Sequence, residues 1–412
     1  MSQLPKVIER YYLSEYHRNA VFVPSGRFGI YAIVKSVFSP GDKIIVSPLT
    51  CPTAVLALFA GGVIPVFVDV DIETGNIDVE KLSRNLLGRV KGVMTTNLYG
   101  TPDRTNELAS LCEKSGLFLL EDCAHIVDAR IGGRRVGSIG NAAAFSFYKF
   151  LNTYGGVVLS KNRKLLQNVR AIVDSEGMKT TRLEALSDRL KWGLVHGVPG
   201  GGKIKEHIKT SRSRLRSAFG SGVREPVKQP LSYAGVGPLD AASLKPLHGH
   251  FAYSGKPYDK CPSASVLKRT SQVFGSIDEL IDLKRMMNDR LIEECPLQLK
   301  RAPYETDYCN FLVPYFSDYR DKIVERLLIE KRIKVWYVYN PPLSDVFDGN
   351  SFVNMQQSPE IAREWGRRVL PVDSTYRKEY LEIIQKTDSK SSRVDLKAES
   401  PQVAENINML HH

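Results

Sequence analysis

The stretch from Leu117 to Leu159 reads LFLLEDCAHIVDARIGGRRVGSIGNAAAFSFYKFLNTYGGVVL and holds three short apolar runs separated by glycine-rich turns. The first run ends at Asp122, the second leads to Lys149, and the third ends at Leu159. Short apolar runs bounded by glycine are typical of buried parallel strands, and α/β proteins place their chemistry at the carboxyl ends of such strands. The stretch therefore predicts a carboxylate at one strand end and a lysine just past the next.

Such a pair suits the chemistry of pyridoxal phosphate. A lysine can form an imine with the aldehyde of this cofactor, and an aspartate can hold the pyridine nitrogen protonated so that the ring accepts electrons. Each residue alone also has an ordinary structural explanation, since an aspartate at a strand end often caps a turn and a lone lysine is usually a solvated charge. The interpretation therefore depends on the motifs upstream as well.

The bulk composition is that of a globular protein large enough for two domains. Of the 412 residues, 42% are hydrophobic and 25% are charged. No run approaches the roughly 18 apolar residues that span a bilayer, and the charged first twenty residues predict no signal peptide. Six cysteines without a CxxC pair and eight histidines without an HExxH motif predict a cytoplasmic enzyme with reduced thiols and no metal site.

The net charge of +12 is concentrated in residues 179–228, which hold twelve Lys/Arg against four Asp/Glu. Such a cluster can serve an anionic substrate, a membrane surface or nucleic acid, or be only a solvated face. A small anionic substrate is a simpler partner than a membrane, because about two or three of the cations would suffice for it. Apolar residues such as Leu183, Leu190 and Trp192 leave membrane-surface contact open. No recognition motif accompanies the charge, so we expect no nucleic-acid partner.

Predicted strands and helices alternate along most of the chain. Strands are expected at 21–24, 43–47, 65–70, 92–97, 311–316, 334–339 and 369–372, and helices at 1–20, 28–38, 54–60, 78–87, 106–115, 163–173, 263–294, 320–330, 358–368 and 377–386. This order predicts an α/β fold of right-handed βαβ units around a mostly parallel sheet. We expect a large domain at 1–250 with a basic insertion at about 179–237, a small α/β domain at 251–387, and a disordered tail at 388–412.

A second candidate site lies near the N-terminus, at Ser25-Gly26-Arg27. A short predicted strand, a glycine turn and a helix start follow one another there. Because the first backbone N–H groups of a helix lack intrahelical acceptors and its dipole favours negative charge, such a junction can bind an anion. One glycine in a βα turn is common, so this motif is weak alone.

Taken together, the motifs resemble the DegT-type family of pyridoxal-phosphate-dependent sugar aminotransferases, which have the fold of aspartate aminotransferase, fold type I. The segments that carry the resemblance are SGRFGIYAIVKSV, GDKIIVSPLTCPTAVLALFAGGVIPVFVDVD, NLYGTP, LFLLEDCAH, GSIGNAAAFSFYK, PPL and RRVLPVD. They occur in the family's order and cover most of residues 15–175 and 263–385. As a set they are specific, although no single one is.

The resemblance implies a role for each candidate residue. Lys149 would be the Schiff-base lysine and proton carrier, and Asp122 would pair with the pyridinium nitrogen. The remaining residues would hold the cofactor by its phosphate, its ring face or its ring hydroxyl: Gly26, Arg27 and Ser146 at the phosphate, Thr50 or Cys51 over the ring, and His125 beside the hydroxyl. This chain departs from the family's usual pattern in having Arg27 in place of a small hydroxyl residue and His125 in place of glutamine. Lys149 also comes two residues early.

The implied reaction moves an amino group from glutamate or glutamine to a keto-sugar, which we expect to be nucleotide-linked. The family also implies a homodimer with active sites at the subunit interface. Three alternatives stay open: dehydration, which family members perform with the lysine replaced; another reaction such as desulfuration, which needs a reactive cysteine; and a non-catalytic protein that binds anionic partners. Retention of Lys149 favours transamination over dehydration.

Overall fold

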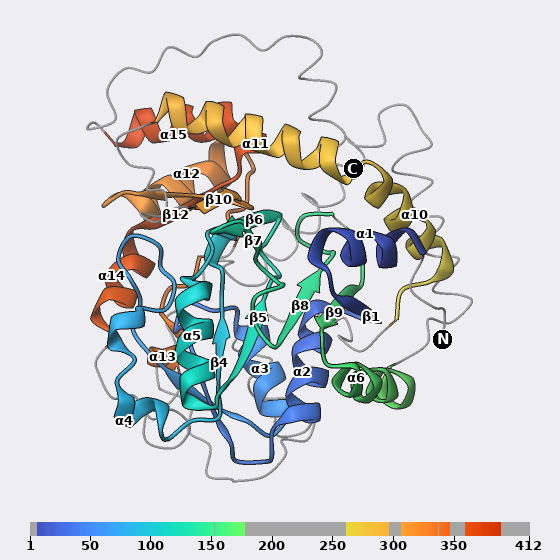
Figure 1. Ribbon diagram of the computed structural model, residues 1–412. Helices are drawn as coiled ribbons and strands as arrows, with labels where there is room; N and C mark the ends of the chain where they lie inside the picture. The colour runs from blue at the N-terminus through green and yellow to red at the C-terminus, as the bar shows by residue number, and fades with distance from the viewer. Residues whose placement is uncertain are drawn as a thin grey trace.

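The computed structural model describes residues 6–151, 153–177, 261–295, 306–336, 338–346 and 359–388. Its centre is a seven-stranded sheet in the order β1-β9-β8-β5-β4-β2-β3 (Figure 1). The strands, in sheet order, are β1 (Asn19–Val23), β9 (Gly156–Ser160), β8 (Ala142–Ser146), β5 (Phe118–Asp122), β4 (Gly92–Thr95), β2 (Lys43–Val46) and β3 (Ile64–Phe67). All neighbouring pairs from β8 to β3 are parallel, whereas β9 is antiparallel to both β8 and β1.

Helices cover both faces of this sheet, because successive strand residues point to opposite sides. Met94 of β4 lies on one face of the sheet, which packs against α2 (Gly26–Val37), α3 (Pro52–Ala60) and α6 (Arg163–Glu176). Its neighbour Val93 packs with the other face, against α4 (Arg84–Leu87) and α5 (Thr105–Ser115). At the β9 end, that second face is covered by α1 (Lys6–Tyr16) and α10 (Ala264–Gly275). The described residues also form three short 3-10 helices: η1 (Val79–Lys81), η2 (Leu98–Gly100) and η3 (Ser374–Tyr376).

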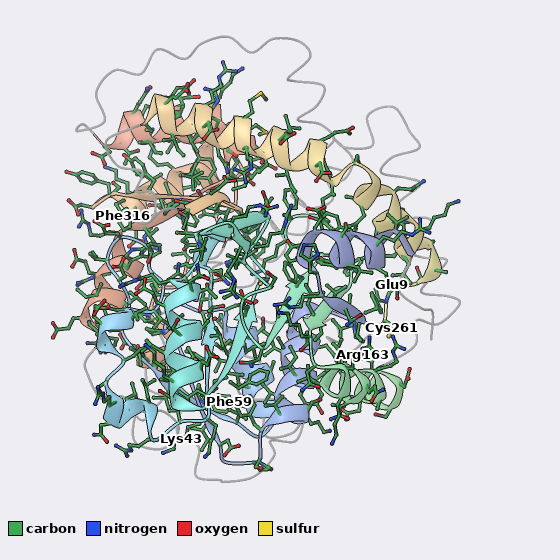
Figure 2. All side chains as sticks on the ribbon, in the orientation of Figure 1. Glu9, Lys43, Phe59, Arg163, Cys261 and Phe316 are labelled. Atoms are coloured by element: carbon green, nitrogen blue, oxygen red, sulfur yellow. The ribbon has the colours of Figure 1, made fainter. Side chains whose placement is uncertain are left out.

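The C-terminal part builds a second, smaller core. A two-stranded antiparallel sheet, β11 (Val313–Phe316) and β12 (Val369–Val372), packs with α11 (Ile277–Glu294), α12 (Arg320–Glu330) and α15 (Arg377–Thr387). Figure 2 labels Phe59 on α3 in the large sheet's core and Phe316 on β11, where it packs in a separate cluster. A three-stranded sheet, β10 (Thr306–Cys309), β6 (Asp128–Ile131) and β7 (Arg134–Arg135), joins the two parts.

Helix α14 (Glu360–Arg368) ties the C-terminal part to the large sheet. The buried Asp69 carboxylate accepts hydrogen bonds from the N–H groups of Ile361 (3.2 Å) and Ala362 (2.9 Å) at the start of this helix. The Trp365 indole donates to the Ile72 carbonyl at 2.9 Å, and its ring stacks on Tyr99 with centroids 5.8 Å apart. The short helix α13 (Leu343–Val346) makes a further link, because the Leu343 N–H donates to the Pro48 carbonyl at 2.8 Å. The C-terminal helices α13 and α14 therefore pack directly on loops of the large domain that lie far away in the sequence.

Most predicted elements are confirmed, but the predicted helix 263–294 is two helices, α10 and α11, which are separated at Ser276. Four further corrections apply. The third run of the opening stretch, β9, is antiparallel, because it follows β8 through a short loop and a parallel return needs a crossover of a dozen residues or more. The predicted helix 78–87 is two short pieces, since Asp78 and Ser83 each cap a separate N-terminus. No strand occupies the described residues of 334–339: Ile333 and Val335 pack on the small core while Trp336 stays exposed. The strands β6, β7 and β10 were not predicted.

The predicted basic insertion, residues 179–237, lies outside the described residues, and so does the tail beyond Asp388. The proposed partners of the basic segment therefore stay predictions. Among the described helices, none combines the length and apolar character that a membrane crossing requires.

Candidate active site

The candidate residues collect where the parallel strands end. Asp122 is the last residue of β5, Ser146 is the last residue of β8, and Thr50 and Cys51 follow β2 at the start of α3. Parallel strands bring their carboxyl ends to one edge of the sheet, so these side chains share that edge. Lys149 lies three residues past β8 and is half-buried.

Asp122 is buried, with 5% of its surface exposed. Its Oδ1 atom accepts a hydrogen bond from the Ala124 N–H at 2.9 Å. Burial raises the pKa of Asp122 to about 6, against the opposing effects of the Lys149 charge and of the Ala124 N–H. Asp122 is thus a carboxylate whose charge would gain from a cationic partner in the site.

The neighbouring Glu121 has a different role. It points to the other face of β5, where its two carboxylate oxygens accept from the backbone N–H groups of Gly137 (2.6 Å), Ile139 (2.9 Å) and Gly140 (2.6 Å). Glu121 is fully buried and anchors the loop that leads into β8. Of the two adjacent carboxylates, Glu121 is thus occupied by backbone N–H groups, whereas Asp122 interacts electrostatically with Lys149.

Lys149 is the centre of the cluster. Its Nζ atom is hydrogen-bonded to Nε2 of His125. Burial lowers the pKa of Lys149; Cys51 and Asp122 raise it in opposition, and Arg27 lowers it further. Four of the residues predicted from the sequence therefore act electrostatically or through a hydrogen bond on Lys149.

His125 is held rigidly by its surroundings. The Tyr99 backbone N–H donates to Nδ1 of His125 at 3.2 Å, and the imidazole stacks on Phe311 with centroids 5.5 Å apart and an interplanar angle of 21°. The residue is 4% exposed, and burial, with the Lys149 charge, holds its pKa well below the ordinary value. A neutral imidazole fixed in orientation results.

The sequence analysis did not identify the residues that hold His125 in place. Asn97 and Tyr99 both have positive φ, 46° and 56°. The Asp103 carboxylate stabilises this bend by accepting from the N–H groups of Thr96 (2.9 Å) and Asn97 (2.8 Å), while the Asn97 amide donates to the Asp122 carbonyl at 2.9 Å. The sequence feature that could have indicated these residues is the run of polar residues directly after the buried strand β4, at the carboxyl edge of the sheet.

The start of α2 lies against the end of β8. Ser25 caps the helix, because its hydroxyl accepts from the Phe28 N–H at 3.2 Å. A Cβ atom built on Gly26 would come within 2.8 Å of the Ser146 Cβ, so only glycine permits this approach. Backbone N–H groups at a helix start, the half-buried Arg27 and the Ser146 hydroxyl thus gather at one place, which suits a phosphate.

Thr50 and Cys51 lie at the N-terminus of α3. Thr50 is fully buried, and its Oγ1 atom has no hydrogen-bond partner among the described residues. A buried hydroxyl left in this way is costly unless something else supplies a partner, which indicates a ligand at this position. Cys51 is half-buried, and its Sγ atom lies 3.1 Å from Oγ1 of Thr53.

The fold is that of the aspartate aminotransferase-like proteins, fold type I. The crystal structure of S. venezuelae DesV in complex with a ketimine intermediate superposes with a TM-score of 0.64, at 19% identity, over 96% of this chain and 91% of that one. Residues 11–194 match the DegT/DnrJ/EryC1/StrS aminotransferase family, which confirms the resemblance that the motifs predicted.

Two curated relatives illustrate the match. The spore coat polysaccharide biosynthesis protein SpsC of Bacillus subtilis (strain 168) is 32% identical over 187 residues, which is 44% of this chain and 48% of that protein. The dTDP-3-amino-3,6-dideoxy-alpha-D-galactopyranose transaminase of Aneurinibacillus thermoaerophilus is 35% identical over 136 residues, 32% of this chain and 38% of that protein. The matched part of the chain thus spans about half or less of these relatives' lengths.

The donor set fits pyridoxal phosphate. The close approach that Gly26 permits brings the N-terminus of α2 to Ser146, where a phosphate can be bound. The Thr50 hydroxyl needs an acceptor or donor, and the buried Asp122 carboxylate suits a protonated ring nitrogen. Among the described residues, no group of three His, Cys, Asp or Glu side chains could hold a metal ion.

Proposed function

We propose that this protein is a pyridoxal-phosphate-dependent aminotransferase that moves an amino group onto a keto-sugar. The observation that carries the proposal is the cluster at the carboxyl edge of the sheet, where Lys149 contacts His125 and acts electrostatically with Asp122. The match of residues 11–194 to the aminotransferase family supports it.

Each residue of the cluster has a definite task in this proposal. Bound pyridoxal phosphate supplies the electron sink that stabilises negative charge on the substrate carbon. Asp122 would pair with the ring nitrogen and favour its protonated form, Lys149 would hold the cofactor and accept or release a proton at Nζ, and His125 would orient that amine. Gly26, Arg27 and Ser146 bind the phosphate, while Thr50 and Cys51 contact the ring.

The finer assignments rest on relatives. The transaminase of Aneurinibacillus thermoaerophilus acts on a dTDP-sugar by its name, which supports a nucleotide-linked keto-sugar as the acceptor. Glutamate or glutamine as the amino donor, a homodimer and a cytoplasmic location are proposed on the family resemblance alone. The family match covers residues 11–194, which include all the candidate cofactor residues, so the sugar is the least constrained part of the proposal.

Spectroscopy of the purified chain tests the proposal. The holoprotein should absorb in the visible, glutamate or glutamine should bleach that band, and a nucleotide-linked keto-sugar should restore it. Lys149→Ala should keep the fold and lose turnover by several orders of magnitude. Borohydride reduction and peptide mapping should label Lys149.

Other outcomes separate the alternatives. A band that no amino donor bleaches, with release of water from a keto-deoxysugar substrate, would indicate dehydration. Release of sulfide from cysteine would indicate desulfuration. Failure to bind pyridoxal phosphate would leave the non-catalytic interpretation.

A further inference from the structure

The hydrogen bond between Lys149 and His125 has a direction that the rest of the site determines. A backbone N–H can only donate, and the Tyr99 N–H points at Nδ1 of His125 at 3.2 Å. Nδ1 must therefore present a lone pair, which excludes both the Nδ1–H tautomer and the doubly protonated ring. The proton of the neutral imidazole is left on Nε2, the atom that contacts Lys149.

A donor at Nε2 needs an acceptor at Nζ. An ammonium group has three N–H donors and no lone pair, whereas a neutral amine has one lone pair to offer. We propose that His125 donates its Nε2–H to Nζ and so holds Lys149 as a neutral amine before the cofactor arrives. This positioning role for His125 rests on the proposed function, in which the same amine attacks an aldehyde.

The charged and titratable groups around Lys149 bear on this arrangement. Arg27, at the start of α2, disfavours the ammonium form of Lys149. Asp122, at the end of β5, and Cys51, before α3, both favour the ammonium form. Burial opposes the ammonium form most strongly, and it lowers the pKa of both Lys149 and His125. The balance of these effects agrees with the neutral pair that the hydrogen-bond geometry requires.

The residues packed around His125 fix the direction of its hydrogen bond to Lys149. Phe311 stacks on one side of the imidazole, and Tyr99 lies nearly parallel to it at 6.2 Å and an angle of 19°. The positive φ of Tyr99 aims its N–H at the ring, and the bend is set by Asp103. A neutral amine is the form that attacks a carbonyl, because its lone pair is the nucleophile.

The tautomer can be measured on the full-length chain freed of cofactor. With ¹⁵N-labelled histidine, the signal that disappears in His125→Gln should show protonated Nε2 and unprotonated Nδ1 throughout pH 6–8. An Nδ1–H tautomer, or a ring that gains a proton in this range, would overturn the proposal. This measurement needs no activity, so it fails or succeeds independently of the aminotransferase assignment.

Lysine acetylation read by peptide mapping provides the second arm. Lys149 should react as a low-pKa amine, with the exposed Lys161 and Lys164 as internal references. In His125→Leu the Lys149 pKa should rise by roughly half to one pH unit, because the amine loses the donor to its lone pair. An apolar leucine alone would lower that pKa, so a rise can come only from the lost donor, whereas a fall would show that His125 accepts from an ammonium instead. His125→Gln, which can still donate, should stay within a few tenths of a unit.

Discussion

Replacing Glu121 by glutamine should destabilise the chain while leaving the chemistry of the site in place. Three backbone N–H groups point at the Glu121 carboxylate: Ile139 and Gly140 at Oε1, and Gly137 at Oε2. Glutamine has one oxygen, which can keep the first two bonds. Its NH₂ group must then face the Gly137 N–H, so two buried donors oppose each other.

The size of the effect follows from these counts. Leaving one buried N–H without an acceptor costs about 1–3 kcal/mol, and the buried amide group facing it costs a similar amount. Burial raises the pKa of Glu121, which means that the charge itself is partly penalised and that its removal offsets part of the loss. We therefore expect a decrease of about 2–4 kcal/mol in the free energy of unfolding.

Urea denaturation of the cofactor-free chain, followed by tryptophan fluorescence and circular dichroism, measures this difference. The matched control is Glu80→Gln, because the Glu80 side chain is 77% exposed and its ion pair with Arg104 is a surface pair. That variant should change stability by less than about 0.5 kcal/mol. If Glu121→Gln is as stable as Glu80→Gln, the anchoring role assigned to Glu121 is wrong.

Two further predictions concern the other members of the cluster. Asp122→Asn should keep stability and cofactor binding but lose most transaminase activity, because a neutral amide cannot stabilise a pyridinium; near-normal turnover would show that Asp122 is the wrong partner. Lys149→Met should stabilise the cofactor-free chain by about 1.4 kcal/mol for each unit by which burial lowers the Lys149 pKa. The pKa of Lys149 in the folded chain lies below the ordinary 10.5, so Lys149 destabilises the chain fully below its folded pKa and not at all above 10.5. The increase in melting temperature caused by Lys149→Met should therefore shrink as pH rises. An increase that does not depend on pH would refute the prediction.

The sequence pattern located the strand ends, because apolar runs bounded by glycine report burial directly. Periodicity alone does not distinguish Asp122 from its neighbour Glu121, since it places neighbours on opposite faces without saying which face holds the site; the assignment of Asp122 came from the family resemblance. In the structure the Glu121 carboxylate accepts from three loop N–H groups, whereas Asp122 interacts electrostatically with Lys149, which supports the choice of Asp122.

The support of His125 was beyond the reach of periodicity. It depends on the positive φ of Asn97 and Tyr99, which no apolar pattern encodes, and on Phe311, which comes from a distant part of the chain. The antiparallel direction of β9 was missed for a different reason. Its composition is that of any buried strand, and only the short connection after β8 determines its direction.

The stack of Trp365 on Tyr99 bears on how the protein is made. Tyr99 leaves the ribosome long before Trp365, and at about 5–20 residues per second the interval is on the order of tens of seconds. For most of that interval the nascent chain already contains Asp122, His125 and Lys149, yet the Tyr99 ring, which lies beside His125, is not covered by Trp365 of α14. Complete packing around the site thus waits until α14 has been synthesised, and a chain arrested before Trp365 would leave the Tyr99 ring without this partner.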